Sequence, residues 1–403
     1  TLDSATTTPG GDGSQPIGAS GSRPVVGPET VSTTATGTNA TYGVKMVRAP
    51  EVWEEFGTRG EGATVAVLDT GIDPDHPDLN VSGWAEYDAK GNLVSDDVSD
   101  ASDVDGHGTH VAGTVAGGNA SGTAIGVAPE SDLYGVKVLN DTGSGTFMQV
   151  VAGMEHATEN ESVDVLQMSF GGDGQVDGFI EPIQKARSAG KVVVASSGNS
   201  GNGTSSSPGN VYESFAVGAV DETRDVAWFS GGETLNTSED WNNDTLTADW
   251  PAEYVVPDAS APGVSVNSAA AGGGYRSLSG TSMAAPHVSG VAALMISAST
   301  RNVSDDELFD TLRDTADHPD NASDPDDRYG TGVVDGYAAV SSITENRSNL
   351  TVTEFDAPAE TTPGETLETT ATINNTGVDP GAGTVEYRFN DTVGDTANVS
   401  LAP

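Results

Sequence analysis

The sequence contains no cysteine, few basic residues and no long apolar run. Without cysteine, disulfides and thiol catalysis are excluded. The composition therefore does not indicate whether the protein works in an oxidising or a reducing compartment. No stretch approaches the roughly 18 apolar residues of a transmembrane helix. There is no initiator Met and no signal-peptide pattern, and the opening TLDSATTTPGGDGSQ resembles the interior of a precursor. We therefore expect a processed or truncated product.

The shortage of basic residues gives the chain an extreme charge. There are 16 Lys and Arg against 60 Asp and Glu, a net charge of -44. Such a surface repels nucleic acid and anionic lipid. Disorder would also require low hydrophobicity, whereas 35% of the residues are hydrophobic. Because the Debye length is only about 3 Å at molar salt, self-repulsion is screened there, and the composition favours a salt-adapted protein.

The chain divides into three parts by pattern. Residues 1–40 are rich in Gly, Ser, Thr and Pro without periodicity and predict a disordered linker or tail. In residues 41–345, β-branched runs alternate with helical patterns, which predicts an α/β three-layer sandwich with a mostly parallel central sheet. Strands are predicted over 64–69, 131–139, 163–170, 191–197 and 214–220, and helices over 107–116, 146–160, 179–188, 282–298 and 305–316.

Two further segments differ from this alternation. Residues 346–403 carry four short strand-like segments and no helix pattern. A β-sandwich usually needs about seven strands, so we predict a truncated, Ig-like β-sandwich domain. Residues 231–253 are acidic, bear two tryptophans and lack a period, and we predict a long surface loop.

Four polar residues stand where predicted strands end or helices begin. Asp69 closes the first strong strand, His107 opens a helix, Asn199 follows a strand and Ser282 precedes a long helix. In parallel α/β sheets, sites collect at the carboxyl ends of the strands. Serine, histidine, aspartate and an amide are the groups used in acyl transfer. The order Asp, His, Ser excludes the α/β-hydrolase and chymotrypsin-like orders and leaves that of subtilisin.

The motifs around these residues resemble those of subtilisin-like serine proteases, and in particular the secreted halolysins of salt-loving archaea. VAVLDTGID contains Asp69, GHGTHVAG contains His107, ASSGN contains Asn199 and GTSMAAPHVSG contains Ser282. The match runs from about residue 42 to residue 340. Four ordered motifs form a far more specific signal than one.

The resemblance implies roles for these residues. Ser282 would attack the scissile carbonyl, His107 would act as general base and acid, and Asp69 would orient His107. Asn199 and the Ser282 N–H would stabilise the oxyanion. Extended backbone beside the site would pair with the substrate chain. The matching segments contain Gly143, Ser144 and Gly145 on one side and Ser169, Phe170, Gly171, Ser197 and Gly198 on the other.

The resemblance also implies that the chemistry needs no cofactor and that a structural calcium ion could bind at Asp78. The loop 117–126 has a length similar to the family's calcium loop. An asparagine ligand that the family often supplies is replaced by Ala120, which would leave mostly carbonyl oxygens, ligands that Ca²⁺ accepts. A solvated acidic turn is the alternative for Asp78.

Each residue also has an ordinary structural interpretation. Ser282 alone would be an N-cap, Asp69 a turn residue, and Asn199 a turn residue after Gly198. The i,i+3 pair His107 and His110 lacks the glutamate of a zinc-protease motif. The two glycines in residues 143–145 could equally belong to an ordinary loop or to a backbone edge that pairs with the substrate chain. Pro286 lies inside the predicted helix, where proline normally breaks it, and the sequence offers no account of it.

The sequence thus predicts a secreted, salt-adapted serine endopeptidase acting on proteins or peptides, extracellular or associated with the cell surface. An inhibitory propeptide and a surface partner of the C-terminal domain are expected, and a nucleic-acid partner is not. One alternative is a non-catalytic surface scaffold or adhesion protein that keeps the fold. Another is a ligase or processing enzyme that uses the same residues.

Overall fold

The computed structural model describes residues 17–19, 39–242, 250–299, 303–319, 325–344, 350–356, 370–375, 381–389 and 392–401. The chain divides into two compact units, Thr1–Ser342 and Ile343–Pro403. The residues predicted to bear the chemistry all lie in the first unit.

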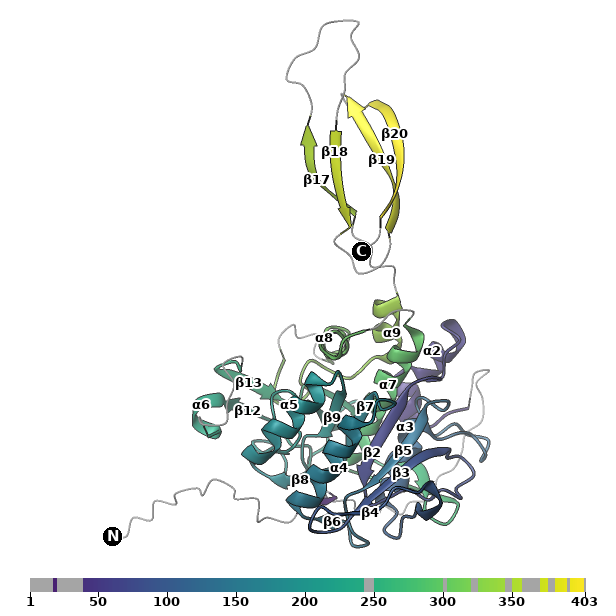
Figure 1. The fold of residues 1–403 in the computed structure, drawn as a ribbon, viewed down its shortest axis with the longest axis vertical. Coiled ribbons are helices and arrows are strands. Elements are labelled where there is room, and N and C mark those ends of the chain that lie inside the picture. Colours follow the sequence, from purple (N-terminus) through teal and green to yellow (C-terminus); the bar gives the residue numbers. More distant parts are fainter. Residues whose placement is uncertain are drawn as a thin grey trace, which may run out of the picture. The chain divides into compact units, whose positions relative to one another are not determined.

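An eight-stranded sheet forms the centre of the first unit (Figure 1). Its strand order is β14-β11-β9-β7-β2-β5-β3-β4. Seven of these strands run parallel and β4 pairs antiparallel with β3 at the edge. The mostly parallel sheet predicted from the sequence is therefore confirmed. In chain order the strands are β2 (Thr64–Asp69), β3 (Val81–Tyr87), β4 (Leu93–Ser95), β5 (Asp132–Lys137), β7 (Val165–Met168), β9 (Val192–Ser196), β11 (Phe215–Val220) and β14 (Ala259–Pro262).

Helices cover both faces of this sheet, as strand β7 illustrates. Leu166 and Met168 join a core cluster that includes residues of α4 (Phe147–Glu159) and α5 (Ile180–Ser188). Gln167 points to the other face, where its Oε1 accepts a hydrogen bond from Ser289 of α7 (Thr281–Ala298). Alternate residues of a strand face opposite sides of the sheet, so α4 and α5 form one layer and α7, with α3 (His107–Ala116), forms the other.

The remaining elements surround this three-layer core. They are α1 (Tyr42–Met46), α2 (Ala49–Glu55), β6 (Ser144–Gly145), β8 (Phe170–Asp173), β10 (Ser206–Ser207), β12 (Glu233–Asn236), α6 (Thr237–Asp240), β13 (Glu253–Val256), β15 (Val266–Ala270), β16 (Gly274–Leu278), α8 (Asp305–Asp314) and α9 (Gly336–Thr344).

The predicted loop over residues 231–253 is in part regular structure. Strands β12 and β13 pair antiparallel, and α6 follows β12. Trp241 and Trp250 are buried and pack edge to face, with ring centroids 5.3 Å apart. Residues 243–249 lie outside the described residues. The sequence predicted a surface loop because the acidic residues of this segment obscure the pattern of the two strands, β12 and β13, that pair at its ends.

A short strand lies within the predicted N-terminal tail. Strand β1 (Ile17–Ala19) pairs antiparallel with β6 on one side and with β8 on the other, and β10 extends the same four-stranded sheet. The edges of β6 and β8 offer main-chain donors and acceptors to any extended segment. The rest of residues 1–38 lies outside the described residues.

The second unit consists of two antiparallel pairs. Strand β17 (Leu350–Asp356) pairs with β18 (Thr370–Asn375), and β19 (Gly381–Phe389) pairs with β20 (Thr392–Leu401). The described strands number four, as the pattern of residues 346–403 predicts. A truncated β-sandwich remains a prediction for this unit.

Candidate active site

Three neighbouring central strands bring the candidate residues together at their carboxyl ends. Asp69 is the last residue of β2, Ser169 follows β7, and Asn199 follows β9 by three residues. The register pairs Leu68 with Met168 and Met168 with Ala195. Adjacent strands lie about 4.8 Å apart, so side chains just beyond these pairs share one small region.

Asp69 and His107 form a direct hydrogen bond. Nδ1 of His107 lies 2.7 Å from Oδ1 of Asp69, which also accepts the Thr70 N–H at 2.7 Å. Gly108 allows helix α3 to approach β2, because a Cβ there would lie 2.1 Å from the Gly71 carbonyl oxygen. The Asp69 and His107 residues are fully buried. Among the described residues, no partner contacts His107 Nε2, the nitrogen that a reacting hydroxyl would need.

The surroundings raise the pKa of His107 above its ordinary value. Burial alone would lower it by penalising the imidazolium, but the charge and hydrogen bond of Asp69 outweigh burial. Asp105 and Asp103 add smaller contributions in the same direction. A histidine whose imidazolium is stabilised by a carboxylate is suited to take up a proton during a reaction.

Ser282 is held against the end of β7 by two reciprocal hydrogen bonds. Its hydroxyl donates to the Ser169 carbonyl oxygen at 2.9 Å, and the Ser169 hydroxyl donates to the Ser282 carbonyl oxygen at 2.7 Å. The second bond explains Pro286. Proline has no N–H, so the carbonyl four residues earlier, that of Ser282, lacks its helical donor. Ser169 supplies the donor instead.

Asn199 faces the start of the same helix. Its Oδ1 accepts the Thr281 N–H at 2.9 Å and shares the Thr281 hydroxyl with the Gly198 carbonyl oxygen, each 3.1 Å from that hydroxyl. These two donors fix the amide, so that its oxygen faces Thr281 and its NH₂ group faces away. An amide donor fixed beside a helix N-terminus is suited to stabilising a developing negative charge.

The segments predicted to bind substrate flank β1. Ser144 pairs with Gly18 and Gly145 with Ile17 on one side, and Gly171 pairs with Gly18 on the other. Gly143 has a φ of 73° and turns the chain into β6. Phe170 pairs with Ala19 through its main chain, whereas its ring is fully buried in the core cluster with α4 and α5. The Phe170 side chain therefore does not line the predicted pocket.

The residues around Asp78 do not fit the predicted calcium site. Its Oδ1 accepts the Ala120 N–H at 2.5 Å and its Oδ2 accepts the Tyr275 hydroxyl at 2.6 Å. In the described part of the chain, no group of three or more His, Asp or Glu side chains could hold a metal ion. Both carboxylate oxygens thus accept hydrogen bonds from protein donors, which tie the 117–126 loop and strand β16 to Asp78.

The other histidines make structural contacts. Burial lowers the pKa of His110 to about 3, and its Nε2–H donates to the Val266 carbonyl at 2.9 Å. Burial lowers the pKa of His287 to about 4, and its Nδ1–H donates to the Met283 carbonyl. Both imidazoles are therefore neutral near pH 7. His76, His156 and His318 contact Gly274, two tyrosines and Asp326, respectively.

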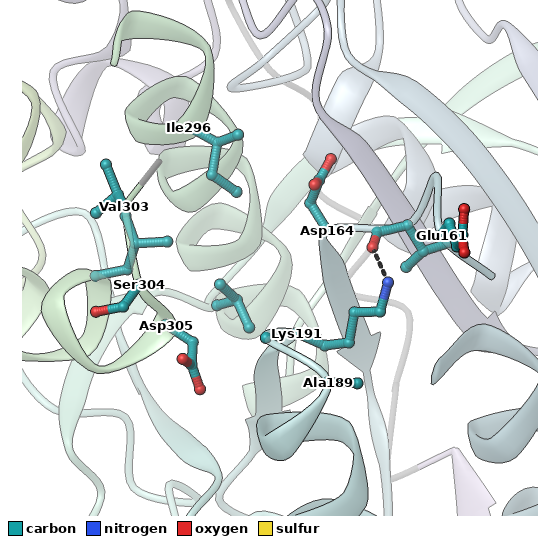
Figure 2. A pocket seen from close by; sticks show the side chains of 12 residues that line it. Glu161, Asp164, Ala189, Lys191, Ile296, Val303, Ser304 and Asp305 are labelled. Carbon is teal, nitrogen blue, oxygen red and sulfur yellow. Dashed lines mark hydrogen bonds between the residues drawn. The ribbon is translucent and has the colours of Figure 1, made fainter. Parts of the chain in front are cut away.

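A cavity of about 610 Å³ lies at the amino ends of the central strands, opposite the candidate active site (Figure 2). Asp164 and Lys191, which line it, precede β7 and β9, so they stand at the amino ends of the strands. Lys191 Nζ donates to the carbonyl oxygens of Val163 at 2.6 Å and Asn160 at 2.8 Å. The cavity therefore lies at the amino ends of the strands, and it is not part of the candidate active site.

Sequence reasoning missed residues that hold the site in place. Thr281 orients Asn199, and Gln167 donates its Nε2–H to the Ser169 hydroxyl at 2.7 Å. Thr281 adjoins Ser282 in the motif and could have been singled out there. Gln167 carried a signal too, as a polar residue inside an apolar strand that must find a buried partner.

The fold and these contacts define a serine hydrolase site on a parallel α/β sheet. The sequence model described as "Subtilase family" matches residues 60–332. Subtilisin amylosacchariticus of Bacillus subtilis subsp. amylosacchariticus is 38% identical over 303 residues, covering 74% of this chain and 70% of that protein. A subtilisin of Bacillus pumilus shares the same identity over 98% of its length. An intracellular serine protease of Paenibacillus polymyxa is 38% identical over 282 residues, 67% of this chain and 78% of that protein.

The chain belongs to the subtilase family and is a serine endopeptidase of subtilisin type. Proteins are therefore its substrates, and the alternative of a non-catalytic scaffold falls away. Among the helices of the described residues, none is long and apolar enough to cross a membrane.

Proposed function

We propose that the chain is a salt-adapted, secreted endopeptidase, similar to halolysins, in which Ser282 attacks the scissile carbonyl. His107 takes the Ser282 proton through Nε2 and returns it to the leaving amine, and Asp69 orients and stabilises the imidazolium. Asn199 and the Ser282 N–H donate to the oxyanion. Water then hydrolyses the acyl-enzyme.

The contact between Asp69 and His107 is the observation that carries this proposal. A buried carboxylate 2.7 Å from Nδ1 sets the proton on that nitrogen and leaves Nε2 as the base. The Ser282 hydroxyl donates to the Ser169 carbonyl here. It would turn to Nε2 when substrate is bound, since catalytic hydrogen bonds tighten in the substrate complex.

The salt adaptation and the secretion rest on composition. A net charge of -44 supports function at high salt. The repelled partners, nucleic acid and anionic lipid, are consistent with a free enzyme outside the cell. The proposal of secretion does not rest on the relatives, because one of them is named an intracellular serine protease. We assign the C-terminal unit a role in binding a cell-surface partner.

Strand β1 supports the expected inhibitory segment. It pairs with the two edges that a substrate chain would use, so the segment around Ile17–Ala19 would exclude other peptides until it is released. Structural calcium at Asp78 is left out of the proposal, because Ala120 and Tyr275 donate to its carboxylate.

Active-site labelling tests the proposal. A fluorophosphonate probe in molar salt should label wild type and Ser162→Ala, a variant of an exposed serine, but not Ser282→Ala. Casein hydrolysis should follow the same order. Labelling without cleavage of casein would point to a narrow processing or ligase role. A folded wild type that takes no label would overturn the proposed mechanism.

A further inference from the structure

Asparagine in this chain is followed two positions later by serine or threonine far more often than the composition explains. Of the 21 asparagines, 15 begin an Asn-x-Ser/Thr triplet, and x is proline in none of them. Ser and Thr make up 82 of the 403 residues, so chance alone would give about four such triplets among 21 asparagines. The triplet is the acceptor sequence for N-linked glycans, and its excess needs an explanation.

A preference for a particular turn does not explain the excess. In Asx turns, a side-chain oxygen of Asn or Asp accepts hydrogen bonds from the residue two positions later. Asn140 accepts the Thr142 N–H at 2.9 Å and the Thr142 hydroxyl at 2.7 Å. Asp97 makes the same two contacts with Ser99. Turns of this kind would therefore enrich both residue types, yet only five of the 37 aspartates have Ser or Thr two positions later, fewer than chance gives.

The fold keeps the asparagines of these triplets at the surface. Wherever the structure describes the exposure of such a side chain, it is exposed or half-buried, as it is at Asn39, Asn80, Asn119, Asn140, Asn160, Asn202, Asn236 and Asn374. Asn210 has no triplet; it is fully buried and bonded to Ser205 and Ser207. A bulky glycan requires an exposed amide, so the placement agrees with the sequence pattern.

Hydrogen bonds distinguish between these positions. Nδ2 of Asn39 donates to the Gly122 carbonyl oxygen at 2.8 Å and to the Thr123 hydroxyl at 2.7 Å. A glycan on Asn39 would replace one of these two N–H donors. Asn140 instead uses its oxygen in the turn with Thr142, so a glycan on Nδ2 leaves those bonds intact. In the first unit, the exposed positions that fit a glycan are therefore Asn80, Asn119, Asn140 and Asn202.

We propose that these four asparagines carry N-linked oligosaccharides. The inference rests on the proposed secretion, because the triplet acts as an acceptor in secreted proteins. In the transfer, Nδ2 attacks the anomeric carbon of an oligosaccharide that is joined through a phosphate to a lipid. A C–N bond forms and the C–O bond to the phosphate breaks. The lipid phosphate leaves with the electron pair, and one amide proton passes to a base of the transferase in the producing cell.

Peptide mass spectrometry of the enzyme secreted by the cells that naturally produce it tests the inference. Peptides that contain the four asparagines should be heavier than their sequences by the mass of a glycan. The peptide around Asn92 is the matched control, because Asn92 is exposed and lacks the triplet. It should have its unmodified mass.

Variants at one triplet give the sharpest test. Thr142→Ser keeps the triplet and should keep the glycan on Asn140. Thr142→Val, which has nearly the same shape without the hydroxyl, should lose it. Asn140→Gln should lose it as well, although Thr142 remains. A modification that survives Asn140→Gln would lie on another residue, such as Thr142, and would contradict the N-linkage at this position.

The outcomes separate this inference from the proposed function. Labelling with the fluorophosphonate identifies active enzyme in the medium. If secreted, active enzyme has unmodified asparagine at all four positions, the inference is wrong and the proposed function stands. If the protein stays inside the cell and is unmodified, the inference fails together with the proposed secretion.

Discussion

The hydrogen bond from Ser169 to the Ser282 carbonyl makes a quantitative prediction about Pro286. Ser169→Ala would leave two buried groups without this partner, the Ser282 carbonyl and the Gln167 amide. Leaving a buried polar group unsatisfied costs about 1–3 kcal/mol, so the variant should lose about 2–6 kcal/mol of unfolding free energy. Pro286→Ala restores an N–H that can reach the Ser282 carbonyl, and should recover about half of that loss.

Urea unfolding of the double-mutant cycle measures this coupling. All four proteins should carry Ser282→Ala, which keeps the carbonyl and prevents digestion of the unfolded chain. Pro286→Ala should be more favourable by about 1–3 kcal/mol in the Ser169→Ala protein than in the protein with Ser169. Additive effects of the two substitutions would refute the reasoning, because they would mean that Ser169 does not replace the missing helical donor.

Four further expectations follow from the site and the surface. Thr281→Val removes one of two donors to Asn199, so kcat should fall about tenfold, the equivalent of one hydrogen bond. Asn199→Leu should lower kcat about 10²–10³-fold, a magnitude known from subtilisin. In the Asn199→Leu protein, Thr281→Val should have no further effect on kcat. Because the pKa of His107 is raised, the pH profile of kcat/KM should have its acidic midpoint above about 6.5, and Asp69→Asn, which removes the cause of the rise, should lower the midpoint as well as the rate. Dilution from molar to low salt should lower the melting temperature followed by circular dichroism, because the net charge of -44 is then unscreened, and an unchanged melt would refute salt adaptation. EDTA should leave the melting temperature unchanged at constant ionic strength, whereas Tyr275→Phe should lower stability by about 1 kcal/mol and the control Tyr212→Phe should not.

Strand ends and helix starts made much of the site predictable. Asp69 and His107 were recognisable because a buried strand ends in a carboxylate and a helix begins with an imidazole, and the two meet at 2.7 Å. The parallel sheet followed from β-branched runs between helical segments. These features depend on local sequence, which is why one chain was enough to predict them.

Other features depend on partners distant in sequence and could not be predicted. Residues 17–19 carry no strand pattern, and β1 exists because β6 and β8 offer free edges to it. Phe170 lies in a motif that implied a pocket wall, but the motif left the direction of its ring open, and the ring lies in the core cluster with α4 and α5 because strand alternation decides its side. Pro286 is tolerated because a hydroxyl 117 positions earlier along the chain, at Ser169, meets the Ser282 carbonyl.

The covalent attachment of β1 to the rest of the chain has a kinetic consequence. Residues 20–41 join β1 to α1 in one polypeptide, so under the proposed function β1 would compete with substrate as an intramolecular ligand, for which effective concentrations are on the order of millimolar. Typical KM values are about 1 μM to 1 mM. If β1 has a dissociation constant similar to these KM values, intact molecules would be mostly self-occupied at substrate concentrations near KM, and dilution would not relieve this, because an intramolecular competitor is never diluted. The specific activity of a preparation would report the fraction of molecules in which that connection has been cut.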